Sequence, residues 1–261
     1  MLSLVSAAAA AAGLALASSA SAQESDLETS SAPAPSAGAV ARDGLFLPST
    51  LSPLVGSVPA YVSGFGGYDS ARDTMVATVT AEVHVWGPFA LRGGAEYSPA
   101  RKEPRPTIGG RVRLLSQERH GVDGSLSAFY RPEGFTEPEG EIETFVSIGR
   151  RVGRVMLAGN LVYGQDPEGN ERDGEIRLGS VYALGERVSL GLDSRLRFAI
   201  GLQKGAMAAA EPQLDFLAAP VVTATAGPLA FFVEVGPSVF KATGTAASVG
   251  VTGLGGVGSV F

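Results

Sequence analysis

The stretch RVSLGLDSRLRFAI, residues 187–200, alternates between two kinds of side chain. In an extended chain, successive side chains point to opposite faces. One face would then carry Val188, Leu190, Leu192, Leu196, Phe198 and Ile200, and the other Ser189, Gly191, Asp193, Arg195, Arg197 and Ala199. The stretch therefore predicts a β-strand with one apolar face and one polar, charged face.

The same period-two pattern recurs from about Val58 to the end of the chain, and the spacing of an amphipathic helix is absent there. Twelve segments show it. We predict strands at about 58–67, 74–85, 88–97, 107–116, 123–131, 141–150, 153–164, 174–183, 187–200, 213–225, 229–240 and 246–261.

The connections between these segments also alternate in length. Those after even-numbered strands are mostly tight, such as WGP, LGE and TAG, whereas most after odd-numbered strands are longer and more polar, such as QDPEGNERDG. Short periplasmic turns and longer extracellular loops are typical of an outer-membrane barrel. We therefore predict an all-β, closed, antiparallel, up-and-down transmembrane β-barrel of about twelve strands. An even strand number places both termini at the periplasmic side.

Aromatic residues form two groups along the predicted strands. One group lies at the outer ends of odd-numbered strands and the other at the opposite ends, as expected for two interfacial girdles. The predicted girdle residues are Tyr97, Tyr130, Tyr163 and Phe198 in the first group, and Trp86, Phe89 and Tyr182, together with Phe261, in the second.

The N-terminal residues point to export. Residues 1–22 carry no charged side chain, and an alanine-rich apolar run leads to Ala-Ser-Ala before Gln23. This is the pattern of a cleaved signal peptide, and a membrane anchor is the alternative. Residues 23–57 are rich in Ser, Ala and Pro and predict a flexible leader. The barrel would then span residues 58–261, and the protein would lie in the bacterial outer membrane.

The overall charge excludes one class of function. The formal net charge is -6, and no run of basic residues suggests a polyanion site, so nucleic-acid binding is not expected. The chain contains no cysteine, so disulfides cannot stabilise it. No pattern for a cofactor or metal site was found. The expected partners are outer-membrane lipid, lipopolysaccharide, the barrel-assembly machinery and small hydrophilic solutes.

Over residues 58–261 the chain resembles bacterial outer-membrane β-barrel proteins of the porin-like kind. The resemblance implies a cleaved signal, an even antiparallel barrel and a terminal phenylalanine, Phe261, that the assembly machinery reads. The last strand of this family is usually apolar at alternate positions back from that residue. Here Val249, Val251 and Val257 follow the pattern, and Gly253, Gly255 and Ser259 depart from it. A soluble periplasmic sandwich is the alternative fold, since it also alternates.

In a barrel the charged face points into the lumen. The predicted lumen-facing residues are Glu82, His84, Arg92, Glu96, Arg111, Arg113, Glu141, Glu143, Glu175, Arg177, Asp193, Arg195, Arg197 and Glu234. Matching the apolar faces across two tight turns sets two strand registers. These registers predict three opposed charge pairs: Glu82 with Arg92, Arg177 with Asp193, and Glu175 with Arg195.

These features favour a narrow passive pore for small hydrophilic solutes through a charge-lined lumen. The alternative is a non-conducting structural or interaction barrel whose outer loops bind lipopolysaccharide or a partner. Catalysis is not expected, because the two histidines, His84 and His120, have no serine motif beside them. The acidic loop 166–175 does not have the ligand spacing of an EF-hand calcium loop. The glycines of 64–67 fit a bend or bulge in a strand better than a phosphate-binding site.

Overall fold

The structure is a computed structural model that describes residues 37–42, 44–99, 103–135, 140–167, 172–200 and 212–261. The predicted signal peptide, 1–22, and the first part of the predicted leader, 23–36, lie outside these residues. Parts of four long connections, at 100–102, 136–139, 168–171 and 201–211, lie outside them as well.

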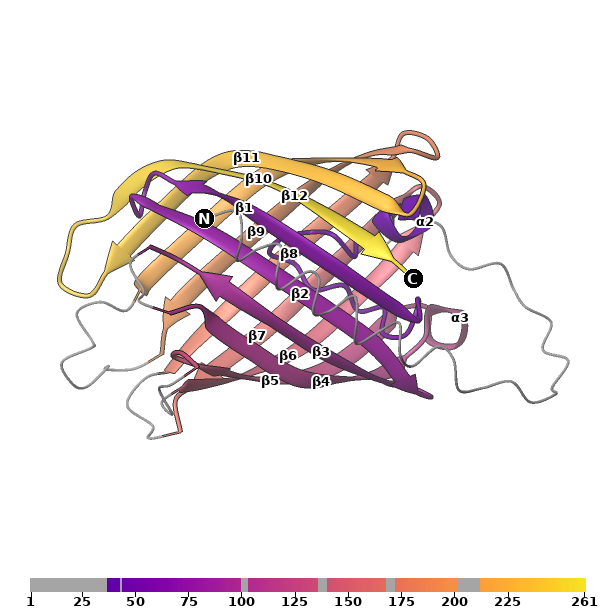
Figure 1. Ribbon diagram of the computed structural model, residues 1–261, viewed down its shortest axis with the longest axis horizontal. Coiled ribbons are helices and arrows are strands. Elements are labelled where there is room, and N and C mark those ends of the chain that lie inside the picture. Colours follow the sequence, from indigo (N-terminus) through magenta and orange to yellow (C-terminus); the bar gives the residue numbers. More distant parts are fainter. Residues whose placement is uncertain (1–36, 43, 100–102, 136–139, 168–171, 201–211) are drawn as a thin grey trace, which may run out of the picture. The chain divides into compact units, whose positions relative to one another are not determined.

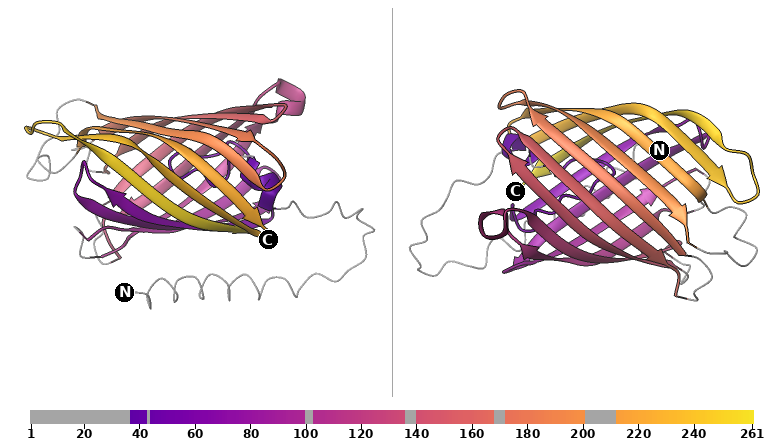
Figure 2. Two further views of the ribbon diagram at one scale, coloured as in Figure 1. Left: turned by 90° about the horizontal axis from the view of Figure 1, so that it is seen from above. Right: turned by 180° about the vertical axis from the view of Figure 1, so that it is seen from behind.

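Twelve antiparallel strands close into a barrel in which each strand pairs with its neighbours in sequence, as Figures 1 and 2 show. The prediction of twelve strands is confirmed, and every boundary lies within two residues of the predicted one. The strands are β1 (Ala60–Asp69), β2 (Thr74–Trp86), β3 (Phe89–Tyr97), β4 (Arg105–Leu115), β5 (Asp123–Pro132), β6 (Gly140–Val152), β7 (Val155–Gln165), β8 (Arg172–Ala183), β9 (Val188–Ala199), β10 (Pro212–Ala226), β11 (Leu229–Ala242) and β12 (Ser248–Val260).

The first and last strands close the barrel. The pairing runs from Tyr61 opposite Val260 to Asp69 opposite Thr252. The backbone N–H of Phe261 adds one more bond, to the carbonyl of Ala60 at 3.0 Å. Because β12 is also paired with β11, the glycine-rich last strand is hydrogen-bonded on both sides and presents no open edge.

Tight turns gather at one end of the barrel. The connections β2–β3, β6–β7 and β10–β11 are two-residue turns that begin with Gly87, Gly153 and Gly227, whose φ angles are 52°, 59° and 58°. Glycine is favoured at this position because only it adopts positive φ without strain. We call this the short-turn end; it also carries the short helix α3 (Gln117–His120). The opposite, long-loop end carries the connections after β3, β5, β7, β9 and β11.

The two faces of the wall differ in polarity. Large apolar side chains are exposed on the outer face of every strand, for example Leu91, Ile108, Leu161, Val233 and Val251. The inner face buries serine, threonine and charged side chains. A soluble sandwich would bury the apolar face and expose the polar one, so this arrangement is that of a membrane barrel. Among the described residues, no helix is long and apolar enough to span a bilayer.

The chain before β1 enters the barrel. Helix α2 (Ala37–Arg42) contacts β8 to β12, and residues 44–58, which we call the inner segment, run along the inner face of the wall. Most of the inner segment is buried. These residues belong to the stretch for which the sequence predicted a flexible leader. The structure instead packs and hydrogen-bonds them against the barrel wall.

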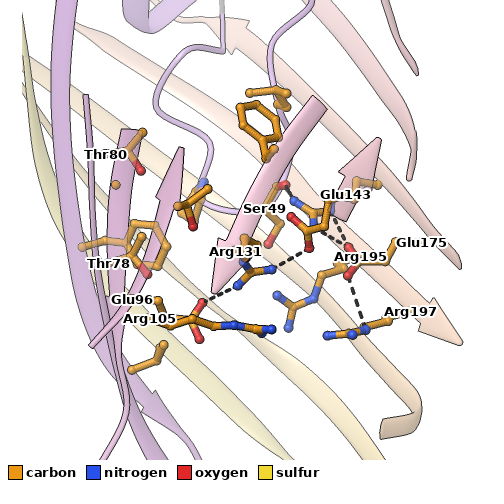
Figure 3. A pocket seen from close by; sticks show the side chains of 18 of the residues that line it. Ser49, Thr78, Thr80, Glu96, Arg105, Arg131, Glu143, Glu175, Arg195 and Arg197 are labelled. Carbon is orange, nitrogen blue, oxygen red and sulfur yellow. Dashed lines mark hydrogen bonds and ion pairs between the residues drawn. The ribbon is translucent and has the colours of Figure 1, made fainter. Parts of the chain in front are cut away.

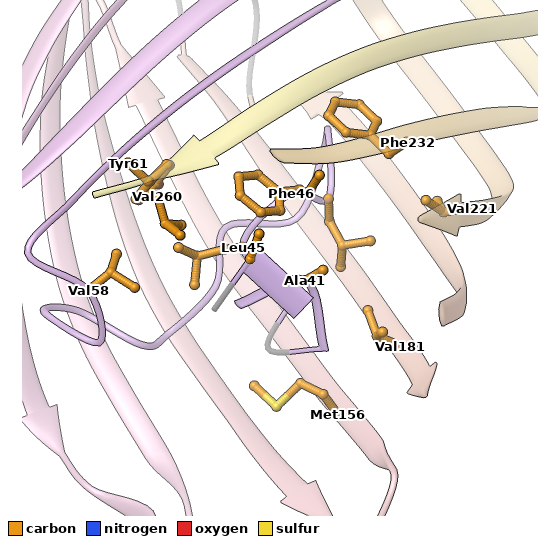
Figure 4. Packing of buried hydrophobic residues seen from close by; sticks show 13 residues of the cluster. Ala41, Leu45, Phe46, Val58, Tyr61, Met156, Val181, Val221, Phe232 and Val260 are labelled. Atoms are coloured by element: carbon orange, nitrogen blue, oxygen red, sulfur yellow. The ribbon is translucent and has the colours of Figure 1, made fainter. Parts of the chain in front are cut away.

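An apolar cluster fixes the inner segment in the short-turn half of the lumen (Figure 4). Phe46 lies edge-on to Tyr61, with ring centroids 6.3 Å apart. A Cβ at Gly258 of β12 would collide with the Phe46 ring, so the glycine leaves room for that ring. Burial of such side chains is worth about 1.5–3 kcal/mol each. The cluster contains Ala37, Ala41, Leu45, Phe46, Leu47, Val58, Tyr61, Met156, Val181, Val221, Ala230, Phe232 and Val260.

Candidate functional site

The lumen contains nearly all the predicted charged residues. Glu82, Arg111, Glu141, Glu143, Glu175, Asp193 and Glu234 are buried inside the barrel. Arg92, Glu96, Arg177, Arg195 and Arg197 are partly buried on the same face. Arg113 is exposed at the short-turn end. His84 is partly buried, and a Cβ at Gly56 of the inner segment would meet its ring.

One of the two predicted registers is observed. Arg92 lies directly opposite Glu82, and its Nη1 atom is 3.5 Å from Glu82 Oε2. Glu82 Oε2 also accepts hydrogen bonds from Arg111 Nη1 at 2.7 Å and from the Tyr61 hydroxyl at 3.2 Å. Strands β1 to β4 therefore contribute one residue each to a four-residue polar cluster, in place of a simple ion pair between β2 and β3.

The second predicted register is wrong by two residues. Tyr182 faces Leu190, not Val188, so Arg195 faces Arg177 and Arg197 faces Glu175. The cause is the turn, where the N–H groups of Leu184 and Gly185 both bond to the carbonyl of Val188.

Because of this register, Asp193 lies opposite Gly179 and not opposite Arg177. The predicted pairs Arg177–Asp193 and Glu175–Arg195 are therefore not directly opposed. Glu175 instead bonds to Arg177 of its own strand, with the Arg177 Nη2 and Glu175 Oε2 atoms 2.5 Å apart.

A cavity of about 540 Å³ occupies the long-loop half of the lumen, and we call it the long-loop chamber. Figure 3 shows the charged side chains that project into it. Among the described residues its lining has nine carboxylates and seven guanidinium groups. The carboxylates are Asp69, Glu96, Glu133, Glu141, Glu143, Asp166, Asp173, Glu175 and Asp215, and the arginines are Arg72, Arg92, Arg105, Arg131, Arg177, Arg195 and Arg197.

These charges form shared pairs. Arg131 bridges two strands, with its Nη1 atom 2.5 Å from Glu143 Oε1 and its Nη2 atom 3.3 Å from Glu96 Oε2. Arg197 bonds to Asp173 and lies within 3.7 Å of both Glu175 and Glu141. Arg131 and Arg197 therefore each have more than one carboxylate within 4 Å.

Asp215 joins the wall to the β1–β2 connection. Its Oδ2 atom accepts hydrogen bonds from Arg195 Nη2 at 2.8 Å and from Arg72. Arg72 also lies over the Phe240 ring, 5.0 Å from its centroid. Burial lowers the pKa of Arg72 below its ordinary value, and the charge of Asp215 opposes this shift.

The inner segment forms the floor of the long-loop chamber, because its residues 45–51 line that cavity. Four wall side chains hold its backbone. The Ser49 N–H donates to Asp193 Oδ2 at 2.6 Å, and the Ser49 carbonyl accepts from Arg177 Nη1 at 3.1 Å. Asn160 bonds to both the N–H and the carbonyl of Leu51, and Arg111 donates to the carbonyl of Ser52.

A second cavity, of about 680 Å³, opens at the short-turn end. Leu54 of the inner segment, Met156 and residues of the β4–β5 connection line it. The two cavities share no lining residue. Residues 45–51 of the inner segment therefore border the long-loop chamber, and Leu54 borders the cavity at the short-turn end.

Glu234 is buried with no hydrogen-bond partner among the described residues. Its side chain points into the lumen from β11 and is 1 % exposed. Within the described residues neither of its carboxylate oxygens has a hydrogen-bond partner. It interacts electrostatically with Asp193 and Arg195. The sequence predicted its inward position, but the pattern carried no sign that it would lack a partner.

The predicted girdle residues lie on the outer face. Trp86 and Phe89 stack near the short-turn end, with ring centroids 5.9 Å apart, and Tyr182 is exposed at the same end on β8, across the barrel from them. Tyr97 and Tyr163 are exposed toward the long-loop end, where Tyr130 and Phe198 are half-buried. The Phe261 side chain is exposed at the end of β12.

The two histidines contact backbone atoms. His84 Nε2 lies 2.8 Å from the carbonyl oxygen of Gly87, and His120 Nδ1 lies 3.3 Å from that of Ser116. Within the described residues neither histidine is hydrogen-bonded to a hydroxyl group that it could activate. The described residues also contain no group of three or more His, Asp or Glu side chains that could hold a metal ion.

Comparison with solved structures relates this barrel to small porins. The NanC porin superimposes with a TM-score of 0.58 at 10% sequence identity, over 77% of this chain and 99% of that porin. The KdgM porin gives a TM-score of 0.53 at 10% identity over the same shares. A structure of the KdgM porin in complex with disordered oligogalacturonate gives 0.52 at 9% identity, again over 77% and 99%.

The sequence itself matches no protein-family model and no curated protein. At these low identities the structural likeness establishes the architecture and leaves the solute open. The barrel closure, the twelve strands, the apolar outer face and the polar lumen all agree with it. The chain therefore has the fold of the small outer-membrane porins.

Proposed function

We propose that the protein is a channel of the bacterial outer membrane that passes small hydrophilic solutes by diffusion. Its long-loop end faces the outside and its termini face the periplasm, as is general for such barrels. The single observation that carries this proposal is the long-loop chamber, a charge-lined cavity of about 540 Å³ inside a barrel whose outer face is apolar.

The similarity to the NanC and KdgM porins supports a channel. The KdgM complex with oligogalacturonate makes oligosaccharides reasonable solutes to test here. The chamber offers both carboxylates and guanidinium groups, so hydroxyl-rich solutes can exchange hydrogen bonds along its wall without a cofactor. The residues that line it form ion pairs and include no activated nucleophile, which favours transport over catalysis.

A second function is favoured by a specific observation. The inner segment lies inside the lumen and borders both cavities, and a barrel closed by it would act as a structural or interaction protein whose outer loops bind lipopolysaccharide or a partner. The two functions differ in one measurable property, which is whether the folded protein passes solutes.

Planar-bilayer recording of the full chain tests the channel, with liposome swelling in neutral and acidic oligosaccharides as a second readout. We expect small, resolved openings with a mild preference for cations, because carboxylates outnumber guanidinium groups in the chamber. Arg131→Gln should strengthen the cation preference, and Glu143→Gln, on the same ion pair, should weaken it.

Protein that is demonstrably folded but passes neither ions nor sugars would contradict the channel. Equal reversal potentials for Arg131→Gln and Glu143→Gln would contradict the chamber as the conducting path, since the two variants change its charge in opposite directions.

A further inference from the structure

We propose that the inner segment is a gate: it closes the lumen at rest, and the channel opens when Ser49 to Ser52 leave the wall. This inference rests on the proposed channel function and adds a closed state and an opening step to it. The inner segment enters and leaves the lumen from the short-turn end, so it can move without any strand separating.

Side chains of the wall hydrogen-bond to backbone groups of the inner segment, so the contact is specific and is more than apolar packing. Asp193 and Arg177 hold the two backbone groups of Ser49, and Asn160 holds those of Leu51. The Thr50 hydroxyl adds a bond to Asp193 Oδ1 at 2.6 Å. A buried loop needs such partners, because an unpaired backbone group in the interior is costly.

A permeating hydrophilic solute would hydrogen-bond to these same wall groups. Asp193 is fully buried and Asn160 is 3 % exposed, so in this state their hydrogen-bonding atoms face the inner segment and not the chamber. A hydrophilic solute can therefore replace the segment bond for bond. Residues 45–51 are themselves the floor of the chamber, so a solute in the chamber contacts the gate directly.

The inner segment is divided into an anchored part and a releasable part. Leu45, Phe46 and Leu47 pack in the apolar cluster, which resists exposure to water. Residues 49–52 are held by the hydrogen bonds to the wall, which water or a solute can exchange at small net cost. The Leu51 side chain also packs against Phe129, Phe145 and Val162, so opening exposes that one apolar side chain as well.

Gly56, whose φ is 70°, lies between residues 49–52 and β1, beyond the anchored residues 45–47. Positions of this kind absorb the backbone rotation of a hinge. We therefore expect residues 49–52 to swing away from the wall while the apolar cluster stays in place.

Two variants of the full chain test the gate in planar bilayers. Asn160→Leu removes both bonds to Leu51, and we expect the time-averaged conductance to rise about tenfold. Gln165→Leu on the same strand is the matched control, because Gln165 accepts only an exposed bond from Tyr163 in the described structure. That control should conduct like wild type.

An engineered disulfide between the inner segment and β8 should hold the gate closed. A Cβ placed at Gly179 would lie 3.0 Å from the Thr50 Cβ and 2.5 Å from Leu47 Cδ1. The end of the Leu47 side chain must therefore shift, and the two Cβ atoms must move apart by about 0.5 Å to reach the separation in a disulfide. The chain has no other cysteine. Thr50→Cys/Gly179→Cys should lose its conductance on oxidation and recover it with a reductant. Each single variant should be insensitive to the oxidant.

The outcomes separate the gate from the channel. If the fully cross-linked pair conducts as well as the reduced pair, or if Asn160→Leu conducts like wild type, the gate is wrong and the channel stands. If no form conducts, the channel function fails, and maleimide labelling of Thr50→Cys decides the gate. Asn160→Leu should then speed that labelling about tenfold, and an unchanged rate overturns the gate.

Discussion

Asn160 bonds to both backbone groups of Leu51. Its Oδ1 atom accepts from the Leu51 N–H at 2.8 Å, and its Nδ2 atom donates to the Leu51 carbonyl at 2.8 Å. The same Nδ2 atom donates to Ser147 Oγ at 2.9 Å. One side chain of the wall thus satisfies a loop residue in the way that a neighbouring strand would, which allows an irregular segment to lie inside the barrel.

The loss of this side chain should destabilise the protein. Asn160→Leu leaves the Leu51 N–H and carbonyl without partners, and each unsatisfied buried group costs about 1–3 kcal/mol. We expect a lower urea midpoint for the protein refolded in detergent micelles, followed by tryptophan fluorescence of Trp86, which is the single tryptophan. Gln165→Leu should leave the midpoint unchanged. Equal midpoints for the two variants would mean that the Leu51 bonds contribute nothing to the folded state.

Glu82 should be among the most sensitive positions in the wall. Its carboxylate compensates Arg111, whose side chain is 1 % exposed. Glu82→Gln keeps the shape but leaves that guanidinium group buried without its counter-charge. Breaking a buried pair on one side costs on the order of 3 kcal/mol.

The same urea measurement checks this prediction, with Glu118→Gln on the exposed face of α3 as the control. A loss below about 1 kcal/mol, the range of exposed pairs, would show that water reaches Arg111 in the folded protein.

Replacing Glu234 should stabilise the protein, whereas replacing Glu82 should destabilise it. It lies opposite Val221 on one side and Leu254 on the other, and it has no hydrogen-bond partner within the described residues. Glu234→Leu replaces an unsatisfied acceptor by an apolar side chain and should raise the free energy of unfolding by about 1 kcal/mol.

Glu143→Leu is the informative comparison, since Glu143 bonds to Arg131 and its loss should be destabilising. If Glu234→Leu also destabilises, then Glu234 has a partner in the folded protein, such as a bound water or ion.

The alternation of side chains was enough to predict the strands and their faces. A period of two identifies both the strand and its lipid-facing side, as in Leu190, Leu192 and Leu196 of β9. The alternation of short and long connections then predicted that strands neighbouring in sequence pair with each other and that the barrel closes. These signals are local, and a regular barrel is the case in which local signals determine the whole architecture.

The inner segment could not be predicted in the same way. Its residues, LFLPSTLSPLV at 45–55, have no regular period, and the Ser- and Pro-rich stretch before them resembles an unfolded leader. What orders the segment is a set of distant side chains, Asp193, Asn160 and Arg111, whose convergence exists only after the barrel closes. A signal was present in the glycines of β12, since Gly258 makes room for Phe46.

The β8–β9 register shows a limit of pattern matching. A shift by one residue reverses the faces of a strand and is easily rejected, but a shift by two preserves them. Tyr182 can face Val188 or Leu190 with equal apolar agreement, and the bonds of the turn decide between them. Opposed charges favoured the wrong register, because Glu175 finds its partner on its own strand.

Cross-linking can test this register. Ser180 faces Leu192, so Ser180→Cys/Leu192→Cys should form a disulfide under mild oxidation, since paired Cα atoms of antiparallel strands lie about 4.5–5.5 Å apart. In the register shifted by two residues Ser180 would face Leu190, so Ser180→Cys/Leu190→Cys serves as the control and should stay reduced. Mass spectrometry of the folded protein reads both outcomes, and the reverse result would restore the shifted register.

Phe261 should matter more for assembly than for stability. Its backbone N–H bonds to the Ala60 carbonyl at 3.0 Å, and its side chain is 61 % exposed on the outer face. Phe261→Ala keeps the backbone bond and removes little buried surface, so the free energy of unfolding of the refolded protein, measured by urea titration, should change by less than about 0.5 kcal/mol.

In cells the same variant should accumulate poorly in the outer membrane, because the assembly machinery would lack the terminal aromatic that it reads in barrels of this kind. Val257→Ala, four residues earlier on the same face of the last strand, is the control for a general loss of apolar surface. Because Gly253, Gly255 and Ser259 depart from the alternating apolar pattern of the last strand, we expect Phe261 to carry most of any assembly signal. Normal membrane levels of Phe261→Ala would show that this barrel is assembled without it.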